Sequence, residues 1–330
     1  AGSASSDVGY GISTDADGNC YATGYFQGTA TFGGDSHTSS GSYDIFVSGM
    51  DTNGNWLWST RAGGISTDIG YGISTNAEGT CYITGSFTNN ASFGISNLTS
   101  SGSSEIFVAK LDANCDWLWA IRAGGTGSDS GNGIALDLSD NCYITGSFSG
   151  TSDFGSTYLT SSGGVDIVIS KIDTNGNWLW AERAGGTGAD AGYGITTDAT
   201  GNCYGTGFFF GTGEFGSTSL TSAGVNELFS TKLDTDGNWL WAQRAGGSSL
   251  DIGYGIASDS NGNCYVTGVI VGAATFGTSS INLSSSNDIC IAKTGLPYPL
   301  ITTNMLGVVD FGNVYLDTVS LPFPVWIKNT

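Results

Sequence analysis

The charged residues of this chain recur at a fixed interval of 61 positions, which makes them the first candidates for chemistry. One acidic column consists of Asp7, Asp68, Asp129, Asp190 and Asp251, and a second consists of Asp44, Glu105, Asp166, Glu227 and Asp288. Eight of the nine basic residues form two further columns, Arg61, Arg122, Arg183 and Arg244, and Lys110, Lys171, Lys232 and Lys293. Chemistry at these positions would therefore be repeated along the chain.

The first acidic column has two interpretations. Five carboxylates that converge at the mouth of a tunnel would bind a cation such as Ca²⁺, although like charges raise each other's pKa unless they are compensated. Alternatively, the acids pair with arginine and accept hydrogen bonds from turn amides, which we favour because buried charges need partners. We therefore expect no cofactor, and the candidate metal ligands are Asp7, Asp68, Asp129, Asp190 and Asp251.

The Asp- and Asn-rich segments 15–19 and 51–55 resemble calcium-binding loops only superficially. A calcium loop needs about 6–8 oxygen ligands and is usually closed by a later bidentate acid. Apolar strand residues follow directly here, so we interpret these segments as hairpin turns with glycine at the position that needs a positive φ.

Catalysis by a serine, a histidine and an acid would depend on His37, the single histidine of the chain. His37 stands where the other units have leucine or isoleucine, so we interpret it as a local substitution in a loop. Carboxylate pairs serve glycoside hydrolysis, yet these acids repeat with the fold, whereas an active site normally breaks such symmetry. We therefore expect no enzymatic activity.

Five of the seven cysteines hold one repeat position, namely Cys20, Cys81, Cys142, Cys203 and Cys264. Equivalent positions in packed sheets lie at least ~10 Å apart, beyond the ~7 Å between Cα atoms that a disulfide can bridge. We expect buried free thiols that act as small apolar residues. Cys115 and Cys290 lie outside this series, and a bridge between Cys264 and Cys290 stays an open alternative.

A repeated Trp-Leu-Trp triplet shows which elements carry these residues. It occupies 56–58, 117–119, 178–180 and 239–241, and residues 1–306 divide into five units without insertion or deletion. Each unit holds a Gly-Tyr-Gly-Ile segment or its variant, a Cys-Tyr segment, a Ser/Thr-rich connection with Phe-Gly, and an apolar run. The first four units then end in Trp-Leu-Trp. Short segments rich in aromatic and β-branched residues between Gly, Asn and Asp turns predict four strands per unit.

Five units of four strands predict an all-β chain, a five-bladed β-propeller of four-stranded antiparallel blades. The small Gly-Tyr-Gly-Ile segment fits the crowded inner strand, and Trp-Leu-Trp fits the outer one. Because side chains alternate along a strand, we expect Trp178 and Trp180 on one face and Leu179 on the other. Each outer strand would then insert two indoles between neighbouring blades.

The unit resembles the bacterial β-propeller repeat family known as SBBP. The resemblance rests on the order Gly-Tyr-Gly-Ile-x-x-Asp, Gly-Asn-Cys-Tyr-x-Thr-Gly, Asp-Ile-Phe-Val-x-Lys-x-Asp and Asn-Gly-Asn-Trp-Leu-Trp-x-x-Arg-Ala-Gly-Gly, and it covers all five units. Membership would imply a secreted or surface-attached bacterial protein, usually without an assigned activity.

Residues 307–330 differ from the repeats. Two segments, 309–314 and 321–330, resemble the first two strands of ASH-type immunoglobulin-like modules, which need about seven strands. We expect either a two-strand tail that pairs with another chain or the start of a module that continues further. The residues expected to mediate self-association are Val309, Phe311, Val314, Leu321, Phe323, Val325 and Ile327.

Composition narrows the function classes. The net charge of −20 repels nucleic acid and anionic lipid, and no apolar run approaches the ~20 residues that cross a bilayer. The start at Ala1 fits a mature N-terminus left by signal-peptide removal, so we expect an extracellular or cell-surface location in a bacterium. The expected function is structural, as a filament or surface-layer subunit joined to itself or to other surface proteins through the C-terminal strands. The alternative is an adhesion or glycan-binding propeller module of a larger secreted protein.

Overall fold

The structure is a computed structural model that describes residues 1–259, 262–277 and 279–294. Every regular element in these ranges is a β-strand, and all strand pairs in its sheets are antiparallel. The prediction of an all-β, antiparallel chain is therefore confirmed. Within the same ranges, no helix is long and apolar enough to pass through a membrane.

The strands follow the sequence units. Unit 1 contains β1 (Val8–Thr14), β2 (Cys20–Phe26), β3 (Thr29–Phe32), β4 (Asp35–Thr38), β5 (Asp44–Met50) and β6 (Trp56–Gly64). Unit 2 contains β7 (Ile69–Thr75), β8 (Cys81–Phe87), β9 (Asn90–Phe93), β10 (Ser96–Thr99), β11 (Glu105–Leu111) and β12 (Trp117–Gly125). Unit 3 contains β13 (Ser130–Leu136), β14 (Cys142–Phe154), β15 (Thr157–Ile172) and β16 (Trp178–Gly186).

Unit 4 contains β17 (Ala191–Thr197), β18 (Cys203–Phe209), β19 (Thr212–Phe215), β20 (Thr218–Thr221), β21 (Glu227–Leu233) and β22 (Trp239–Gly247). In unit 5 the structure describes β23 (Ile252–Ser258), β24 (Cys264–Phe276) and β25 (Ser279–Thr294). In units 3 and 5 the long strands run through the connection that forms separate short strands in the other units.

Within a unit, the strands pair in the order that the sequence predicts. In unit 2 the order is β7, β8, β11 and β12, from the Gly-Tyr-Gly-Ile strand to the Trp-Leu-Trp strand. The middle strands are the most buried. In β11, for example, side chains on both faces of the strand are covered. The first strand carries a bulge in every unit, as between Gly70 and Gly72, and the bulged residue is a tyrosine in four units and Asn132 in unit 3.

The Ser/Thr-rich connection forms a hairpin, which the prediction of four strands per unit missed. In unit 2 this hairpin is β9 and β10, and it leaves its own sheet to pair with β6 of unit 1. Gly63 and Gly64 of β6 lie opposite Ser92 and Ala91 of β9. The same exchange links units 2 and 3, 3 and 4, and 4 and 5. Each unit is therefore hydrogen-bonded to the one before it.

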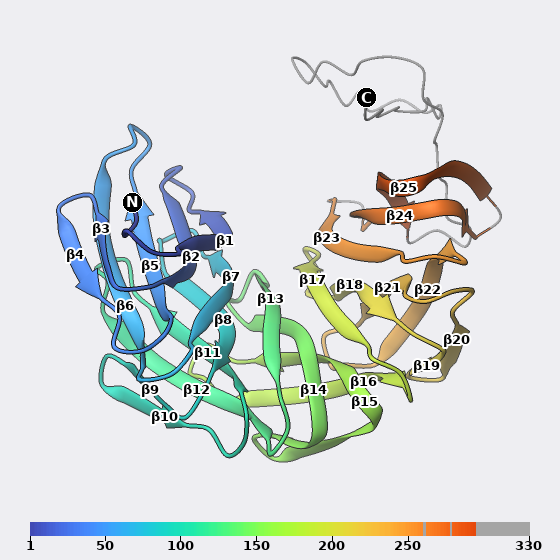
Figure 1. Cartoon of the computed structure of the whole chain (residues 1–330), viewed down its shortest axis with the longest axis horizontal. Coiled ribbons are helices and arrows are strands. Elements are labelled where there is room, and N and C mark those ends of the chain that lie inside the picture. Colours follow the sequence, from blue (N-terminus) through green and yellow to red (C-terminus); the bar gives the residue numbers. More distant parts are fainter. Residues whose placement is uncertain (260–261, 278, 295–330) are drawn as a thin grey trace.

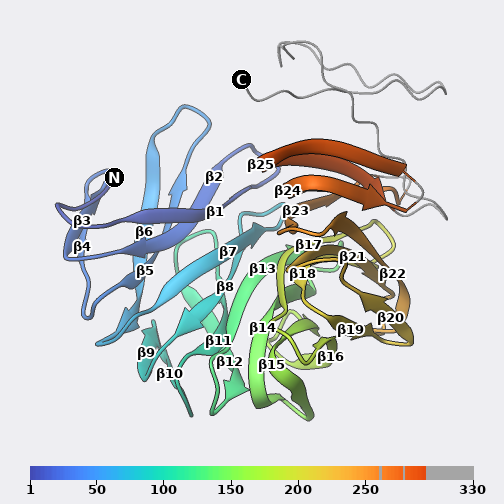
Figure 2. The same cartoon turned by 45° about the vertical axis from the view of Figure 1, so that its right-hand side comes forward.

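The units follow one another in an arc (Figures 1 and 2). The first strands β1, β7, β13, β17 and β23 line its inner side and pack on one another in succession. Units 1 and 5 lie at the two ends of the arc (Figure 1). Among the described residues, no sheet closes on itself.

The hydrophobic core is divided among the junctions between units. Between units 1 and 2, Tyr21, Ile45 and Val47 of unit 1 pack against Ile73, Phe87, Phe93 and Phe107 of unit 2. Equivalent clusters fill the next three junctions. We call the side of a unit that meets the following unit its forward face, and the side that meets the preceding unit its back face.

The prediction that both tryptophans of a triplet point to one face is wrong. Trp117 packs in the junction between units 1 and 2, whereas Trp119 packs in the junction between units 2 and 3. The reason is a β-bulge between Lys110 and Leu111, which lie opposite Trp119 and Trp117 respectively. Each of the three junctions between units 1 and 4 therefore receives one indole from each neighbouring unit. The intervening Leu118 is exposed.

All seven cysteines are free thiols, including Cys264 and Cys290. Cys81, Cys142, Cys203 and Cys264 are buried as expected, whereas Cys20 is half-buried. Cys20 differs because it lies on the back face of unit 1, where no described unit precedes it. The repeated cysteine therefore serves as a small residue of the junction core.

Candidate functional site

The first acidic column binds backbone amides. The two carboxylate oxygens of Asp68 accept hydrogen bonds from the amides of Gly64, at 2.7 Å, and Thr88, at 3.1 Å. Asp190 likewise accepts from Gly186 at 2.7 Å and from Phe210 at 2.8 Å. Asp7, Asp129 and Asp251 make the equivalent pairs of contacts. Asp68 and Asp190 thereby tie the last residue of the preceding outer strand to the residue that follows β8 or β18.

The second acidic column pairs with arginine. Asp44 contacts Arg61 of the same unit, and Arg122 donates to Glu105 at 2.7 Å. Asp166–Arg183 and Glu227–Arg244 repeat this pair. The four carboxylates are buried, while the arginines keep about a third of their side-chain surface.

The two acidic columns meet at each junction. A Cβ atom on Gly63 would lie 2.8 Å from Oδ2 of Asp68 and 3.1 Å from the carboxyl carbon of Asp44, so only glycine leaves room for both carboxylates. Its φ of 134° is also one that side chains rarely adopt. Gly124 stands in the same way between Asp129 and Glu105. The result is a repeated group of two carboxylates and one guanidinium.

The proton affinity of these acids follows from their burial. Burial raises the pKa of Asp68 to about 6, although its two amide donors act in the opposite direction. Burial also raises the pKa values of Asp129, Asp190 and Asp251. Within the described ranges, no three or more His, Cys, Asp or Glu side chains are grouped so that they could hold a metal ion. The five aspartates are distributed one to a unit, each with its own amide donors.

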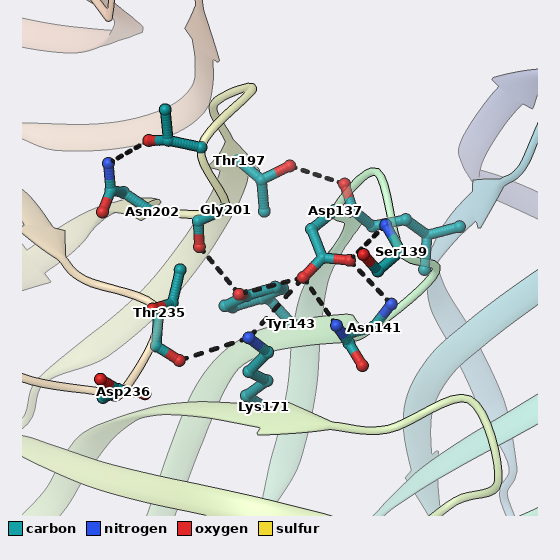
Figure 3. A network of polar contacts seen from close by, with 12 residues as sticks. Asp137, Ser139, Asn141, Tyr143, Lys171, Thr197, Gly201, Asn202, Thr235 and Asp236 are labelled. Carbon is teal, nitrogen blue, oxygen red and sulfur yellow. Dashed lines mark hydrogen bonds and ion pairs between the residues drawn. The ribbon is translucent and has the colours of Figure 1, made fainter.

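The lysine column connects neighbouring units, as Figure 3 shows for units 3 and 4. The ammonium group of Lys171 donates to the carbonyl oxygen of Thr235 at 3.3 Å and lies 3.6 Å from Asp137. Tyr143 donates its hydroxyl to the carbonyl oxygen of Gly201 at 2.8 Å. Lys171 also lies over the ring of Tyr143, 4.9 Å from its centroid, in a cation–π contact.

The turn aspartates cap their own hairpins. Asp51 accepts hydrogen bonds from the amides of Asn53 and Asn55, both at 2.8 Å, and from the Asn55 side chain. The hydrogen bonds from Asn55 lower the pKa of Asp51. Asp15 makes the corresponding contacts to Asn19 and also accepts from Tyr21. Their oxygens are thus engaged by the turn itself.

One polar cluster of unit 1 breaks the repeat and was not predicted from the sequence. His37 Nε2 lies 2.8 Å from Ser59 Oγ, and Ser59 Oγ lies 3.5 Å from Oδ2 of Asp35. The position of His37 is leucine or isoleucine in the other units, that of Asp35 is serine or threonine, and that of Ser59 is alanine in units 2 to 4. Three coincident departures from the repeat were the signal that could have revealed it. The carboxylate contacts the serine, whereas in a catalytic triad it would orient the histidine through the other ring nitrogen.

A row of tyrosines on the inner side of the arc was also missed. Tyr10 lies 5.1 Å from Tyr71, and Tyr193 stacks on Tyr254 at 5.4 Å between ring centroids. Asn132 interrupts the row in unit 3, where its side chain donates to the carbonyl oxygen of Gly192. The bulge of each first strand places these side chains, and Tyr10 and Tyr254 are each about half exposed.

The seven residues expected to mediate self-association lie outside the described residues. They are Val309, Phe311, Val314, Leu321, Phe323, Val325 and Ile327.

Comparison with known proteins supports a propeller repeat. Residues 240–270 match the family described as β-propeller repeat, SBBP. The chain is 26% identical over 347 residues to an uncharacterized WD repeat-containing protein of Acanthamoeba polyphaga mimivirus, covering 84% of this chain and 24% of that protein. It is 27% identical over 142 residues to the regulatory protein FlaEY of Caulobacter vibrioides, covering 42% of this chain and 15% of that protein. The chain thus spans about a quarter or less of the length of these relatives.

A solved structure with a looser likeness is that of a protein of unknown function from Bacteroides caccae. The TM-score is 0.39 at 12% identity, and the match covers 85% of this chain and 77% of the other. At this TM-score the two arrangements differ too much for the likeness to support an inference.

Proposed function

We propose that the five units are blades of a β-propeller and that the chain is a non-enzymatic structural protein that assembles outside the cell. The observation that carries this proposal is the use of the repeated charged groups in contacts that hold the fold. The described arginines bind buried carboxylates, and the acidic column from Asp7 to Asp251 binds backbone amides. Side chains committed to the same contact in successive units support a scaffold.

The location and the assembly are supported by the sequence. The SBBP match agrees with the resemblance that implies secreted or surface-attached proteins. The alternating apolar residues Leu321, Phe323, Val325 and Ile327 support pairing of the C-terminal strands with a second copy or with another surface protein. Head-to-tail contacts of this kind extend into filaments when the rotation between copies does not close a ring.

Electron microscopy and light scattering of the full chain test this proposal. We expect particles larger than one chain of 33.8 kDa, and their growth with concentration. A full chain that stays at the mass of one copy at every concentration would exclude an assembling structural protein. Deletion of residues 308–330 then tests the C-terminal route, because assembly that survives the deletion must use another surface.

A second candidate function, binding of a glycan, is favoured by the tyrosine row of Tyr10, Tyr71, Tyr193 and Tyr254. Aromatic faces give large contact area at low entropic cost, and their hydroxyl groups supply hydrogen bonds. Titration with linear oligosaccharides of glucose or N-acetylglucosamine tests it by calorimetry. Binding that is lost in Tyr254→Ala and kept in Tyr158→Ala, an exposed tyrosine of β15, would support this function. Equal behaviour of the two variants would exclude the row as the site.

A further inference from the structure

The forward face of unit 5 is exposed where all other forward faces are buried. Ile289 is 60% exposed, Ile291 is 51% exposed and Tyr265 is 37% exposed. The equivalent residues of the four other units are at most 2% exposed. The equivalents of Ile289 are Ile45, Ile106, Ile167 and Leu228, those of Ile291 are Val47, Val108, Ile169 and Ser230, and those of Tyr265 are Tyr21, Tyr82, Tyr143 and Tyr204. In each of those units, the back face of the following unit covers them.

The back face of unit 1 is the complementary surface. Ile12 is 70% exposed, whereas its equivalent Ile73 in unit 2 is 6% exposed because unit 1 covers it. Cys20, Ala22 and Met50 are half-buried on the same face, where unit 2 has the buried residues Cys81, Ile83 and Leu111. Phe26, Phe32 and Phe46 form a core beneath this surface.

The polar groups of an inner junction have counterparts on both ends. Between units 3 and 4, Tyr143 and Lys171 donate to the carbonyl oxygens of Gly201 and Thr235 (Figure 3). Tyr265 and Lys293 hold the donor positions in unit 5, and Gly18 and Thr52 hold the acceptor positions in unit 1. The two ends thus carry the two halves of one contact.

We infer that the forward face of unit 5 in one copy binds the back face of unit 1 in a second copy, in the manner of an inner junction. The inference rests on the proposed function, because it supplies a contact through which copies assemble. Ile289, Ile291 and Tyr265 would cover Ile12, Ala22 and Met50 of the next copy, with the Tyr265 hydroxyl directed to the carbonyl oxygen of Gly18.

The pairing of each hairpin with the outer strand of the preceding unit does not block this contact. In unit 1, Gly2 pairs with Thr31 of β3, with hydrogen bonds of 3.1 and 3.2 Å in the two directions. This is the pairing that Gly63 of β6 makes with Ser92 in the next unit. The edge of β3 is therefore already occupied, and docking needs only the two strand faces.

The contact is mainly apolar, and the copies that form it each carry a charge of −20. Repulsion between like-charged molecules is screened over about 8 Å at physiological ionic strength and over shorter distances at higher salt. Added sodium chloride is therefore expected to strengthen association, and the measurement is made at low and at high salt.

The test uses the full chain with one substitution on each face. Ile289→Asp blocks the forward face and Ile12→Asp blocks the back face, while Ile95→Asp is the matched control, because Ile95 is 87% exposed in unit 2, away from both ends. All three variants gain the same charge. Thermal unfolding checks that each one folds, and Ile291→Asp replaces Ile289→Asp if the latter does not.

We expect the wild type and Ile95→Asp to exceed 33.8 kDa in light scattering, while each end variant alone stays at that mass. An equimolar mixture of the two end variants should form a complex of twice the mass that does not grow further, because one intact face of each kind remains. End variants that assemble alone would overturn the inference but leave the proposed function, with its contact elsewhere. An end-variant mixture that stays at one chain while the wild type assembles would also overturn it, and a monomeric wild type would overturn both.

Discussion

The indole Nε1 of Trp180 donates a hydrogen bond to the carbonyl oxygen of Thr235 in the next unit, at 3.0 Å. Trp58 and Trp119 make the same bond to Ala113 and Thr174. The acceptor lies in the turn before the next outer strand. One side chain in each of units 1 to 3 therefore fixes the distance to the outer strand of the next unit.

Replacement of Trp180 tests what this contact contributes. Trp180→Ala removes the indole from its packing against Tyr143 and should cost about 3 kcal/mol of unfolding free energy. Trp180→Phe keeps part of the packing but loses the hydrogen bond, and should cost about 1 kcal/mol. Urea denaturation measures both. Leu179→Ala is the control, since Leu179 is exposed and should change stability little. Equal costs at 179 and 180 would contradict this role.

Asp68 should make the free energy of unfolding fall as the pH rises. Burial raises its pKa from 3.8 to about 6, so the folded state binds a proton more readily than the unfolded state. The stability that the protonated group contributes is fully present below pH 3.8 and is lost as the pH rises through 6. The free energy of unfolding of wild type relative to Asp68→Asn should therefore fall between pH 4 and pH 7. Parallel pH profiles of the two proteins would contradict the shift.

The repeated cysteines should resist thiol reagents in the folded chain. Burial raises the pKa values of Cys81 and Cys203 to about 12, and that of Cys142 is also raised, so little thiolate exists at pH 8. Labelling with iodoacetamide followed by mass spectrometry should modify the half-buried Cys20 and Cys115 before the buried cysteines. Labelling in urea should reach every cysteine. Early modification of Cys142 in native buffer would show that the junction between units 2 and 3 opens.

Cys115 occupies a position that favours glycine. Its φ is 73°, and the equivalent residues Gly54, Gly176 and Gly237 have φ values of 83°, 86° and 87°. A side chain in this region costs about 1–2 kcal/mol, so Cys115→Gly should raise the melting temperature. The reverse change, Gly176→Ala, should lower it, because the added Cβ would lie 3.2 Å from the Trp119 ring. Calorimetry that shows shifts in the opposite sense would contradict strain at this turn.

The Ser59–His37 contact should not produce hydrolysis. The Asp35 carboxylate contacts Ser59 and so does not hold the histidine as a general base requires. We expect wild type, Ser59→Ala and His37→Leu to hydrolyse p-nitrophenyl acetate at the same background rate. A rate that falls in both variants while Ser48→Ala stays at wild type would identify Ser59 as a nucleophile.

The strand order was predictable because each segment carries a strong local pattern. Gly-Tyr-Gly-Ile, the Cys-Tyr segment, the apolar run and the Trp-Leu-Trp segment appear as paired strands in the predicted order. The hairpin of Thr29–Phe32 and Asp35–Thr38 was not predicted, because the alternation of a four-residue strand is too short to identify it and the partner of the equivalent hairpin in later units lies in the preceding unit. Non-local pairing of so short a segment leaves no mark on its own sequence.

The side-chain directions were harder to predict than the strands. A single bulge between Lys110 and Leu111 reverses the face of Trp117 relative to Trp119, since alternation has a period of two. The pairing of arginine with an acid could be anticipated from the charge columns. The contact between His37 and Ser59 was missed because each residue alone resembles an ordinary surface substitution, and only their coincidence with Asp35 in one unit signals the cluster.

The hairpins that pair with the preceding outer strand have a consequence for how such a chain changes length. Because β9 of unit 2 is bonded to β6 of unit 1, the stretch of sequence that repeats is not a self-contained piece of the fold. A duplication or loss of one full period restores every such bond wherever within the period it begins. A duplication or loss that separates an outer strand from the hairpin of the next unit leaves that strand without its partner. For rearrangements that span several elements, the interlock therefore favours whole multiples of the repeat.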